Sequence, residues 1–265
     1  VGLSEMLAQG LNTHSTFLVH DQTNYNYGGP SSSGKSMYIE FVNQRHYRAQ
    51  QCFLSVRLID NADSSVMLEK RYFITTDNLL TVQKDFQTLK VVQPSSMVQR
   101  IETLVPQHSQ VLQLYYQAHQ LLIQGDSDSL NQASVLLAQI TKQSPEFIYA
   151  RAEKALVDIL LNSYQPFNAS DLADLRKEIT DVEAIPLLQN SAIIQQIYTV
   201  DYLSQGKVDE AFKMINKGID LEMSWLNYVL LGKVYELKGQ NNLAADAYIT
   251  AFNLRPGNNT LDWIK

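Results

Sequence analysis

One segment of the chain matches a phosphate-binding motif. Residues 29–36 spell GPSSSGKS, which fits the pattern G-x-x-x-x-G-K-S of the P-loop. That loop needs a buried strand before it and a helix after it, so that backbone N–H groups and a helix N-terminus hold the phosphates. Here a loop rich in Asn and Tyr precedes the motif, and a strand pattern, MYIEFVN, follows Lys35. We therefore predict a surface loop, and a nucleotide-hydrolysing enzyme is the least favoured of three possible functions.

The histidines are scattered, and none has metal-ligand spacing to another histidine or to the single cysteine, Cys52. A nucleophile elbow, G-x-S-x-G, does not occur either. We expect no catalytic residue, no metal and no cofactor. Each histidine could titrate near neutral pH, but a solvated or hydrogen-bonded structural role is expected for His14, His20, His46, His108 and His119.

Carboxylates near the C-terminus offer a different chemistry. Glu236 lies late in one expected helix and Asp246 lies in the next, while Asp220 and Glu222 sit at the preceding turn. Carboxylates that crowd between packed helices raise one another's pKa by like-charge repulsion and partial burial. Such groups would take up protons in mildly acid solution. The alternative interpretation is an ordinary solvated helix face.

A helix hairpin over residues 228–256 must position these carboxylates. Gly232 and Ala244 are small, so two antiparallel helices can approach closely, and Tyr235 and Tyr248 fill the space beside them. A proline at position 256 ends the second helix. This order of small and large residues is typical of a tetratricopeptide-type unit. Such units bind or sense and carry no catalytic group of their own.

Helical spacing of apolar residues continues backwards through the C-terminal part of the chain. The hairpin at 191–220 repeats the one at 228–256 at an offset of 33 residues, which aligns Gly206 with Gly239. A third pair over 112–145 aligns more weakly. We predict a stack of helix hairpins, with helices over residues 112–123, 130–140, 148–161, 169–179, 191–204, 208–219, 225–238 and 243–254.

Strand signals are confined to the N-terminal part. Alternating apolar residues predict strands over 15–20, 37–43, 51–59 and 66–75, the last two joined by the hairpin turn NADSS. Helical patterns cover residues 2–9 and 79–89. The expected fold class is therefore α+β, with an α+β subdomain over 1–105 and a helical-hairpin subdomain over 106–265.

Composition limits the partners. Residues 1–105 carry no net charge, so the net charge of −6 lies entirely in residues 106–265. Nucleic acid is an unsuitable partner for that surface, whereas cations and protons suit it. No apolar run approaches the roughly 20 residues of a membrane span, and no signal peptide is found. A start at Val1 and a stop at Lys265 indicate a fragment of a longer protein.

Four segments carry a resemblance to a known family. These are FVNQRHYRAQQCFLSVRLIDNADSSVML (41–68), the loop SSSGKS, SPEFIYARAEKALVDI (144–159) and GIDLEMSWLNYVLLGKVYELKG (218–239). They resemble the CadC family, the membrane-integrated, acid-responsive activators of the lysine decarboxylase operon in enteric bacteria. The resemblance extends over nearly the whole chain and is to the periplasmic sensor part. The family's cytoplasmic winged-helix DNA-binding domain and its single membrane helix have no counterpart here.

The resemblance implies a non-enzymatic sensor domain on the periplasmic side of the inner membrane. It implies a response to low external pH, feedback by the diamine cadaverine, restraint by a lysine permease through the membrane region, and a homodimer. DNA would be bound only through the cytoplasmic domain absent from this chain. Glu236 and Asp246 match family acid-sensing carboxylates, and a third such position is Leu243 here. Cys52 matches half of a family disulfide whose partner lies upstream.

The resemblance also places diamine-binding candidates at Glu5, Tyr149 and Glu222. Two separated acceptors would suit two ammonium groups, and an aromatic wall would add cation–π attraction. The main alternative is a protein-interaction scaffold that binds a partner protein through its helical hairpins, with any titration incidental. Preference for diamines over monoamines distinguishes the sensor from the scaffold.

Overall fold

A three-stranded sheet forms the N-terminal part of the computed structural model, which describes residues 34–46, 49–75, 78–87, 108–189 and 191–264. The strands are β1 (Lys35–His46), β2 (Ala49–Asp60) and β3 (Val66–Ile74), antiparallel in the order β1-β2-β3. The three strands predicted over 37–75 are confirmed, and β1 and β2 are longer than expected. The strand expected at 15–20 and the helix expected at 2–9 lie outside the described residues.

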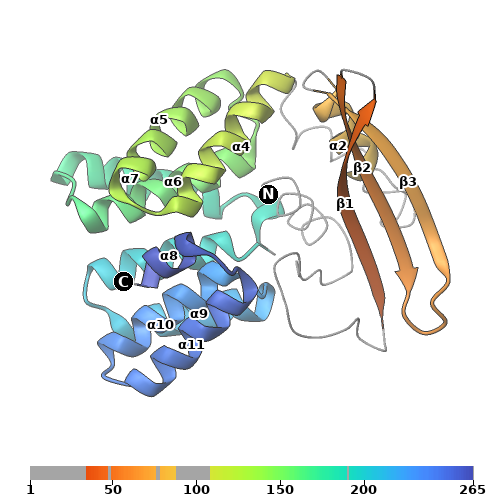
Figure 1. The fold of residues 1–265 in the computed structure, drawn as a ribbon. Coiled ribbons are helices and arrows are strands. Elements are labelled where there is room, and N and C mark those ends of the chain that lie inside the picture. The colour runs from red at the N-terminus through yellow and green to blue at the C-terminus, as the bar shows by residue number, and fades with distance from the viewer. Residues whose placement is uncertain (1–33, 47–48, 76–77, 88–107, 190, 265) are drawn as a thin grey trace.

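Helix α2 (Leu79–Gln87) packs on one face of this sheet (Figure 1). Alternation along β2 buries Leu54 and Val56, and Val82 of α2 covers them. At the edge, Asp85 accepts from Lys70 Nζ at 2.8 Å and from the Tyr72 hydroxyl at 2.7 Å. These two donors, Lys70 first, hold the pKa of the Asp85 carboxyl below its usual value. The helix is thus fixed to the sheet by apolar and polar contacts.

Cys52 lies in β2, where it pairs with Asn43 of β1 and Ile74 of β3. Its side chain is half-buried rather than fully buried, and its thiol is free.

The rest of the described chain is helical, so the α+β class is confirmed. All eight helices predicted over residues 112–254 are present, with bounds that differ by a few residues. Two short helices, η1 and α12, were not predicted. The helices are α4 (Ser109–Gln124), α5 (Ser127–Gln143), α6 (Ile148–Tyr164), α7 (Ala169–Glu183), η1 (Pro186–Leu188), α8 (Ile193–Ser204), α9 (Val208–Leu221), α10 (Trp225–Leu237), α11 (Asn241–Leu254) and α12 (Asn258–Ile264).

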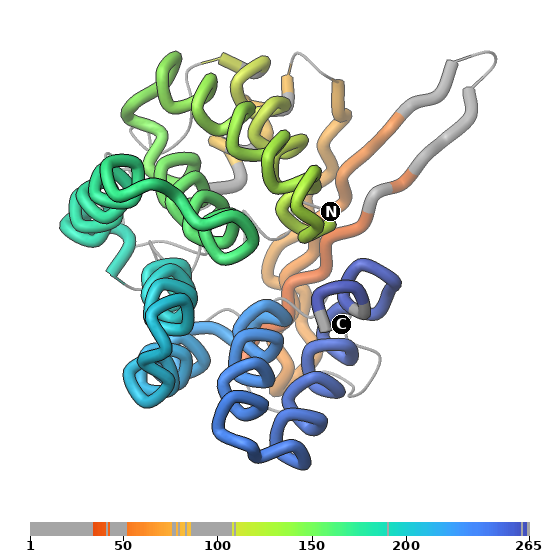
Figure 2. Tube along the Cα trace, turned by 90° about the vertical axis from the view of Figure 1, so that its left-hand side faces the viewer, coloured from red at the N-terminus to blue at the C-terminus, as the bar shows by residue number. Residues whose placement is uncertain are grey.

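Helices from α4 to α12 follow an arc around one continuous hydrophobic core (Figure 2). The last helix, α12, packs back on the first, α4. Trp263 makes this contact, since its indole Nε1–H donates to the carbonyl oxygen of Ile123 at 3.0 Å. The arc is therefore closed by a residue pair far apart in the sequence.

Two glycines confirm the expected 33-residue offset. Gly206 follows α8 and Gly239 follows α10, with φ of 71° and 70°. Both take the left-handed conformation that ends a helix and that glycine adopts without strain. Helix α11 ends at Leu254, two residues before the proline that was expected to stop it. Assignment of these hairpins to the tetratricopeptide type stays a prediction.

Asp126 supplies the N-cap of α5, and this gives a first testable prediction. Its carboxylate accepts from the Ser129 N–H at 2.9 Å and from the Ser129 hydroxyl. The Ser129 hydroxyl, and then its N–H, lower the pKa of Asp126. Because the pKa is lowered in the folded state, the capping contribution is complete above the unfolded pKa of about 3.9 and is lost as pH falls below it.

We therefore expect Asp126→Ala to lower the free energy of unfolding by about 1 kcal/mol at pH 7. The difference from the wild type should shrink as the pH falls below about 4, because Asp126 is then progressively protonated. Chemical denaturation at pH 7, 5 and 3.5 measures this. Asp128→Ala, in the first turn of the same helix, is the control, and an equal loss from both variants would contradict the role of the cap.

Candidate functional site

The last hairpin places Glu236 beside an aromatic side chain. Gly232 of α10 faces Tyr248 of α11 so closely that a Cβ on the glycine would lie 2.2 Å from Tyr248 Cε1. This confirms the close approach expected of the small residue. The Tyr248 hydroxyl donates a hydrogen bond to Glu236 Oε2 on α10 at 2.7 Å. Burial, followed by the Glu236 contact, raises the pKa of the Tyr248 hydroxyl, so it remains a donor at neutral and acid pH.

Lys233 completes the surroundings of Glu236. Its Nζ lies 3.9 Å from Glu236 Oε2 and 5.7 Å from the centre of the Tyr248 ring. The contacts found for Glu236 among the described residues are thus with a hydroxyl and an ammonium group. Even so, 47% of the Glu236 side chain remains accessible. The Glu236 carboxylate is therefore accessible to solvent or to a partner surface.

Asp246 and Leu243 lie on α11 and are both exposed. Leu243, the position at which the family resemblance places a third acid-sensing carboxylate, has 45% of its surface accessible. Glu236, Leu243 and Asp246 thus all reach the surface of one hairpin. Their role in acid sensing stays a prediction.

The three diamine candidates fall in different places. Glu5 lies outside the described residues. Tyr149 is in the first turn of α6 and is buried. Glu222 is the C-cap residue of α9, and its carbonyl oxygen accepts from Asn227 Nδ2 at 2.7 Å. Asn227 is itself fully buried and also receives a hydrogen bond from Gln196 at 2.7 Å. The backbone at Glu222 is therefore held firmly.

A buried polar cluster between α4 and α6 was not found by sequence reasoning. Glu153 of α6 is 2% exposed. Its Oε2 accepts from the Tyr115 hydroxyl at 2.8 Å and lies 2.9 Å from His119 Nδ1. The hydrogen-bonded role expected for His119 is thereby confirmed. The one available signal was the spacing of four, between Tyr115 and His119 and between Tyr149 and Glu153, which puts each pair on one helix face.

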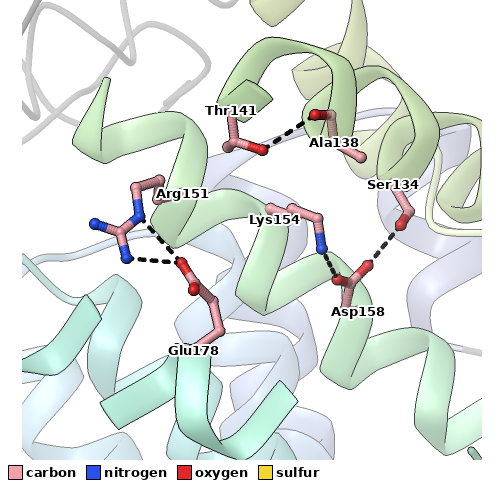
Figure 3. Close-up of polar contacts among 7 residues, drawn as sticks. All are labelled: Ser134, Ala138, Thr141, Arg151, Lys154, Asp158 and Glu178. Carbon is pink, nitrogen blue, oxygen red and sulfur yellow. Dashed lines mark hydrogen bonds and ion pairs between the residues drawn. The ribbon is translucent and has the colours of Figure 1, made fainter. Parts of the chain in front are cut away.

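An open groove of about 640 Å³ runs between α5, α6 and α7. Figure 3 shows polar contacts along it. Arg151 donates from Nε and Nη2 to Glu178 Oε1 at 3.0 and 2.9 Å. Nearby, Asp158 accepts from Lys154 at 2.5 Å and from the Ser134 hydroxyl at 2.6 Å. The remaining lining is formed by Thr141, Pro145, Phe167, Asp171, Asp174 and Leu175.

The P-loop match is not followed by a helix. Strand β1 begins at Lys35, so the residue that would contact phosphate opens a strand. The prediction of a strand after the motif is confirmed, while residues 29–33 lie outside the described part. No group of three or more potential metal ligands occurs among the residues that the structure describes. Of the helices in those same ranges, none is long and apolar enough to cross a membrane.

Comparison with known proteins adds two kinds of similarity. Residues 112–265 match the family model described as CadC C-terminal domain, and residues 1–101 match that described as CadC C-terminal domain 1. The chain is also 55% identical, over 270 aligned residues and its whole length, to "Transcriptional activator CadC" of Escherichia coli (strain K12). The match covers 53% of that protein, so the chain spans about half of its relative's length.

Proposed function

The chain belongs to the CadC C-terminal domain family, and on that premise we propose that it is the periplasmic signal-input domain of a membrane-integrated transcriptional activator. The observation that carries the proposal is 55% identity along the entire chain to an activator. The domain binds no DNA itself. Its output passes to a cytoplasmic DNA-binding domain of the activator.

Two stimuli are proposed, low pH and cadaverine, with lysine decarboxylase expression as the output. The distribution of charge supports both, because the whole net charge of −6 lies in residues 106–265 and such a surface attracts protons and cationic amines. Restraint by a lysine permease through the membrane region completes the scheme.

Acid acts, in this proposal, on Glu236 and Asp246. At neutral pH their charges repel an acidic surface that faces them, either across the subdomains or on a second copy of the chain. Protonation removes the repulsion and favours closer packing, as in a homodimer. If a carboxylate's pKa differs by one unit between the separated and the closely packed state, protonation shifts the equilibrium between those states by about 1.4 kcal/mol. Two coupled carboxylates are then enough to shift a balanced equilibrium by tenfold or more.

We expect the Glu236→Gln/Asp246→Asn double variant of the full-length activator to mimic acid. Reporter transcription at pH 7.5 should rise toward the wild-type level at pH 5.8, and the ratio between the two should fall several-fold. Asp181→Asn/Glu210→Gln removes the same charge from two other exposed helix positions and should leave the ratio unchanged. A normal ratio in the first variant and a flattened one in a triple His14, His20 and His46→Gln variant would instead assign sensing to the histidines.

Cadaverine binding is tested separately with this chain. Its melting temperature should rise more with cadaverine than with butylamine at equal concentration, because a ligand that binds the folded state alone stabilises it. Tyr149→Phe and Glu222→Gln should each reduce the cadaverine shift and leave the melting temperature of the free protein nearly unchanged. Equal shifts for the two amines would reject a diamine site.

A protein-interaction scaffold is the second candidate, and the groove between α5, α6 and α7 favours it. Its ion-paired rim and its partly apolar lining, which includes Leu175 and Phe167, are suited to a peptide. Leu175→Glu, placed at a buried position of this groove, tests that function in cells. Loss of activation by this variant, with a normal cadaverine shift in the isolated chain, would favour the scaffold.

A further inference from the structure

The ion pair between His119 and Glu153 joins two helices that are far apart in the sequence. His119 comes from the last turns of α4 and Glu153 from the second turn of α6. His119 Nδ1 lies 2.9 Å from Glu153 Oε2, and the side chains are 12% and 2% exposed. The carboxylate is therefore sealed in the core while the imidazole still reaches solvent. A proton can reach His119 without any opening of the fold.

Only one of the two carboxylate oxygens of Glu153 has hydrogen-bond partners among the described residues. The Tyr115 hydroxyl and His119 Nδ1 both contact Oε2. Oε1 is buried and has no hydrogen-bond partner among the residues that the structure describes. A buried carboxylate is tolerated when several donors surround it or when a cation neutralises it. With one oxygen lacking a donor, Glu153 depends on the charge of His119.

We propose that His119 and Glu153 form a proton-operated clasp between α4 and α6, closed when the imidazole is protonated and loosened when it is neutral. The proposal goes beyond the exposed carboxylates of the last hairpin. It places a second acid-responsive element inside the helical core. It needs neither cadaverine nor a second copy of the chain.

Among the residues that the structure describes, those around the clasp carry little compensating charge. Tyr115 of α4 contacts both members of the pair, and the Tyr116 and Tyr149 hydroxyls lie close enough to affect its own hydroxyl. Burial raises the pKa of the Tyr115 and Tyr116 hydroxyls well above neutrality, so both stay uncharged. Four charged residues of the neighbouring helices have partners elsewhere: Asp85 of α2 with Lys70, Asp126 at the start of α5 with Ser129, Lys154 of α6 with Asp158, and Asp201 of α8 with Arg176.

The direction of the pH effect follows from the pairing. An imidazolium that gains a buried carboxylate partner on folding keeps its proton to higher pH than in the unfolded chain, where histidine titrates near about 6.5. Stability from the pair is fully present below that unfolded value and is lost as pH rises through the folded one. Acidification toward about pH 6.5 therefore tightens α4 on α6.

Tightening at this point affects the junction between the two parts of the fold. Tyr116, next to Tyr115 on α4, packs against both the helical core and the sheet core. Leu80 of α2 is itself part of the helical core. A change in how firmly α4 is held is therefore passed directly to the helix that covers the sheet.

The experiment compares thermal unfolding of this chain from pH 8 to pH 6 in four variants. The wild type should gain several degrees as pH falls, and His119→Gln and Glu153→Gln should each lose most of that gain. His119→Gln leaves a buried charge unpaired and should melt lower than the double variant His119→Gln/Glu153→Gln, in which that charge is gone. His108→Gln is the control, because His108 is exposed and makes no side-chain cap bond.

Nuclear magnetic resonance supplies a readout that does not depend on stability. The imidazole of His119 should titrate at a pH lower by about one unit or more in Glu153→Gln than in the wild type. The clasp is refuted if His119 titrates alike in both proteins, or if the pH gain in melting temperature survives His119→Gln. The clasp would also be refuted if His108→Gln, and none of the other variants, lost the rise in melting temperature between pH 8 and pH 6.

Discussion

Gly232→Ala should lower the free energy of unfolding by about 1–3 kcal/mol, although alanine is the better helix former by about 0.5–1 kcal/mol. The added Cβ would meet three atoms of the Tyr248 ring at 2.2 to 2.6 Å. The Tyr248 side chain cannot change rotamer freely, because its hydroxyl donates a hydrogen bond to Glu236 Oε2 at 2.7 Å. Two helices must separate or the hydrogen bond must break. Chemical denaturation of the two proteins measures the loss.

The matched control places the same substitution where the ring is absent. In a Tyr248→Ala background, Gly232→Ala should be neutral or stabilising, because only the helix propensity of alanine then remains. Residues 232 and 248 are in direct contact, so the effects of the two substitutions on the free energy of unfolding should not add. Gly232→Ala should destabilise the wild type but not the Tyr248→Ala protein. Equal losses in both backgrounds would mean that backbone strain, not contact with Tyr248, requires the glycine.

That contact was readable from the sequence, and the reason is local. Gly232, Tyr235, Ala244 and Tyr248 lie within one hairpin, so a pattern of small and large residues at helical spacing determines which side chains meet. The strands over residues 35–74 were readable for a similar reason, since alternation specifies which face is buried. Contacts between consecutive helices and strands could therefore be predicted from the sequence.

Contacts between distant segments were not readable. Helix α12 has only seven residues, too few for a periodic pattern, and its partner α4 lies far back in the chain. The pairing of His119 with Glu153 depends on how α4 and α6 cross, which neither helix encodes alone. A lone histidine and a lone glutamate carry no motif. Glu236 and Asp246 could be placed on one hairpin from the sequence, but the contact of Glu236 with the Tyr248 hydroxyl could not be predicted.

Trp263→Ala is expected to have the largest effect on stability, because it opens the arc of helices at its closure. Trp263 is buried, and its ring lies edge-on to Trp225 with centroids 5.8 Å apart. Replacing a buried tryptophan with alanine costs about 3–5 kcal/mol. The Ile123 carbonyl, in the last turn of α4, would also lose the donor that it has from Trp263.

Trp263→Phe separates these two contributions. It keeps most of the apolar bulk but removes the indole N–H, so the loss should be about 1–3 kcal/mol, the cost of an unsatisfied buried acceptor. Asn259→Ala, at an exposed position of the same helix, should change stability by less than about 0.5 kcal/mol. Urea denaturation followed by circular dichroism compares the four proteins. If Trp263→Ala costs no more than Asn259→Ala, α12 does not close the arc, and the helices from α4 to α11 are stable without it.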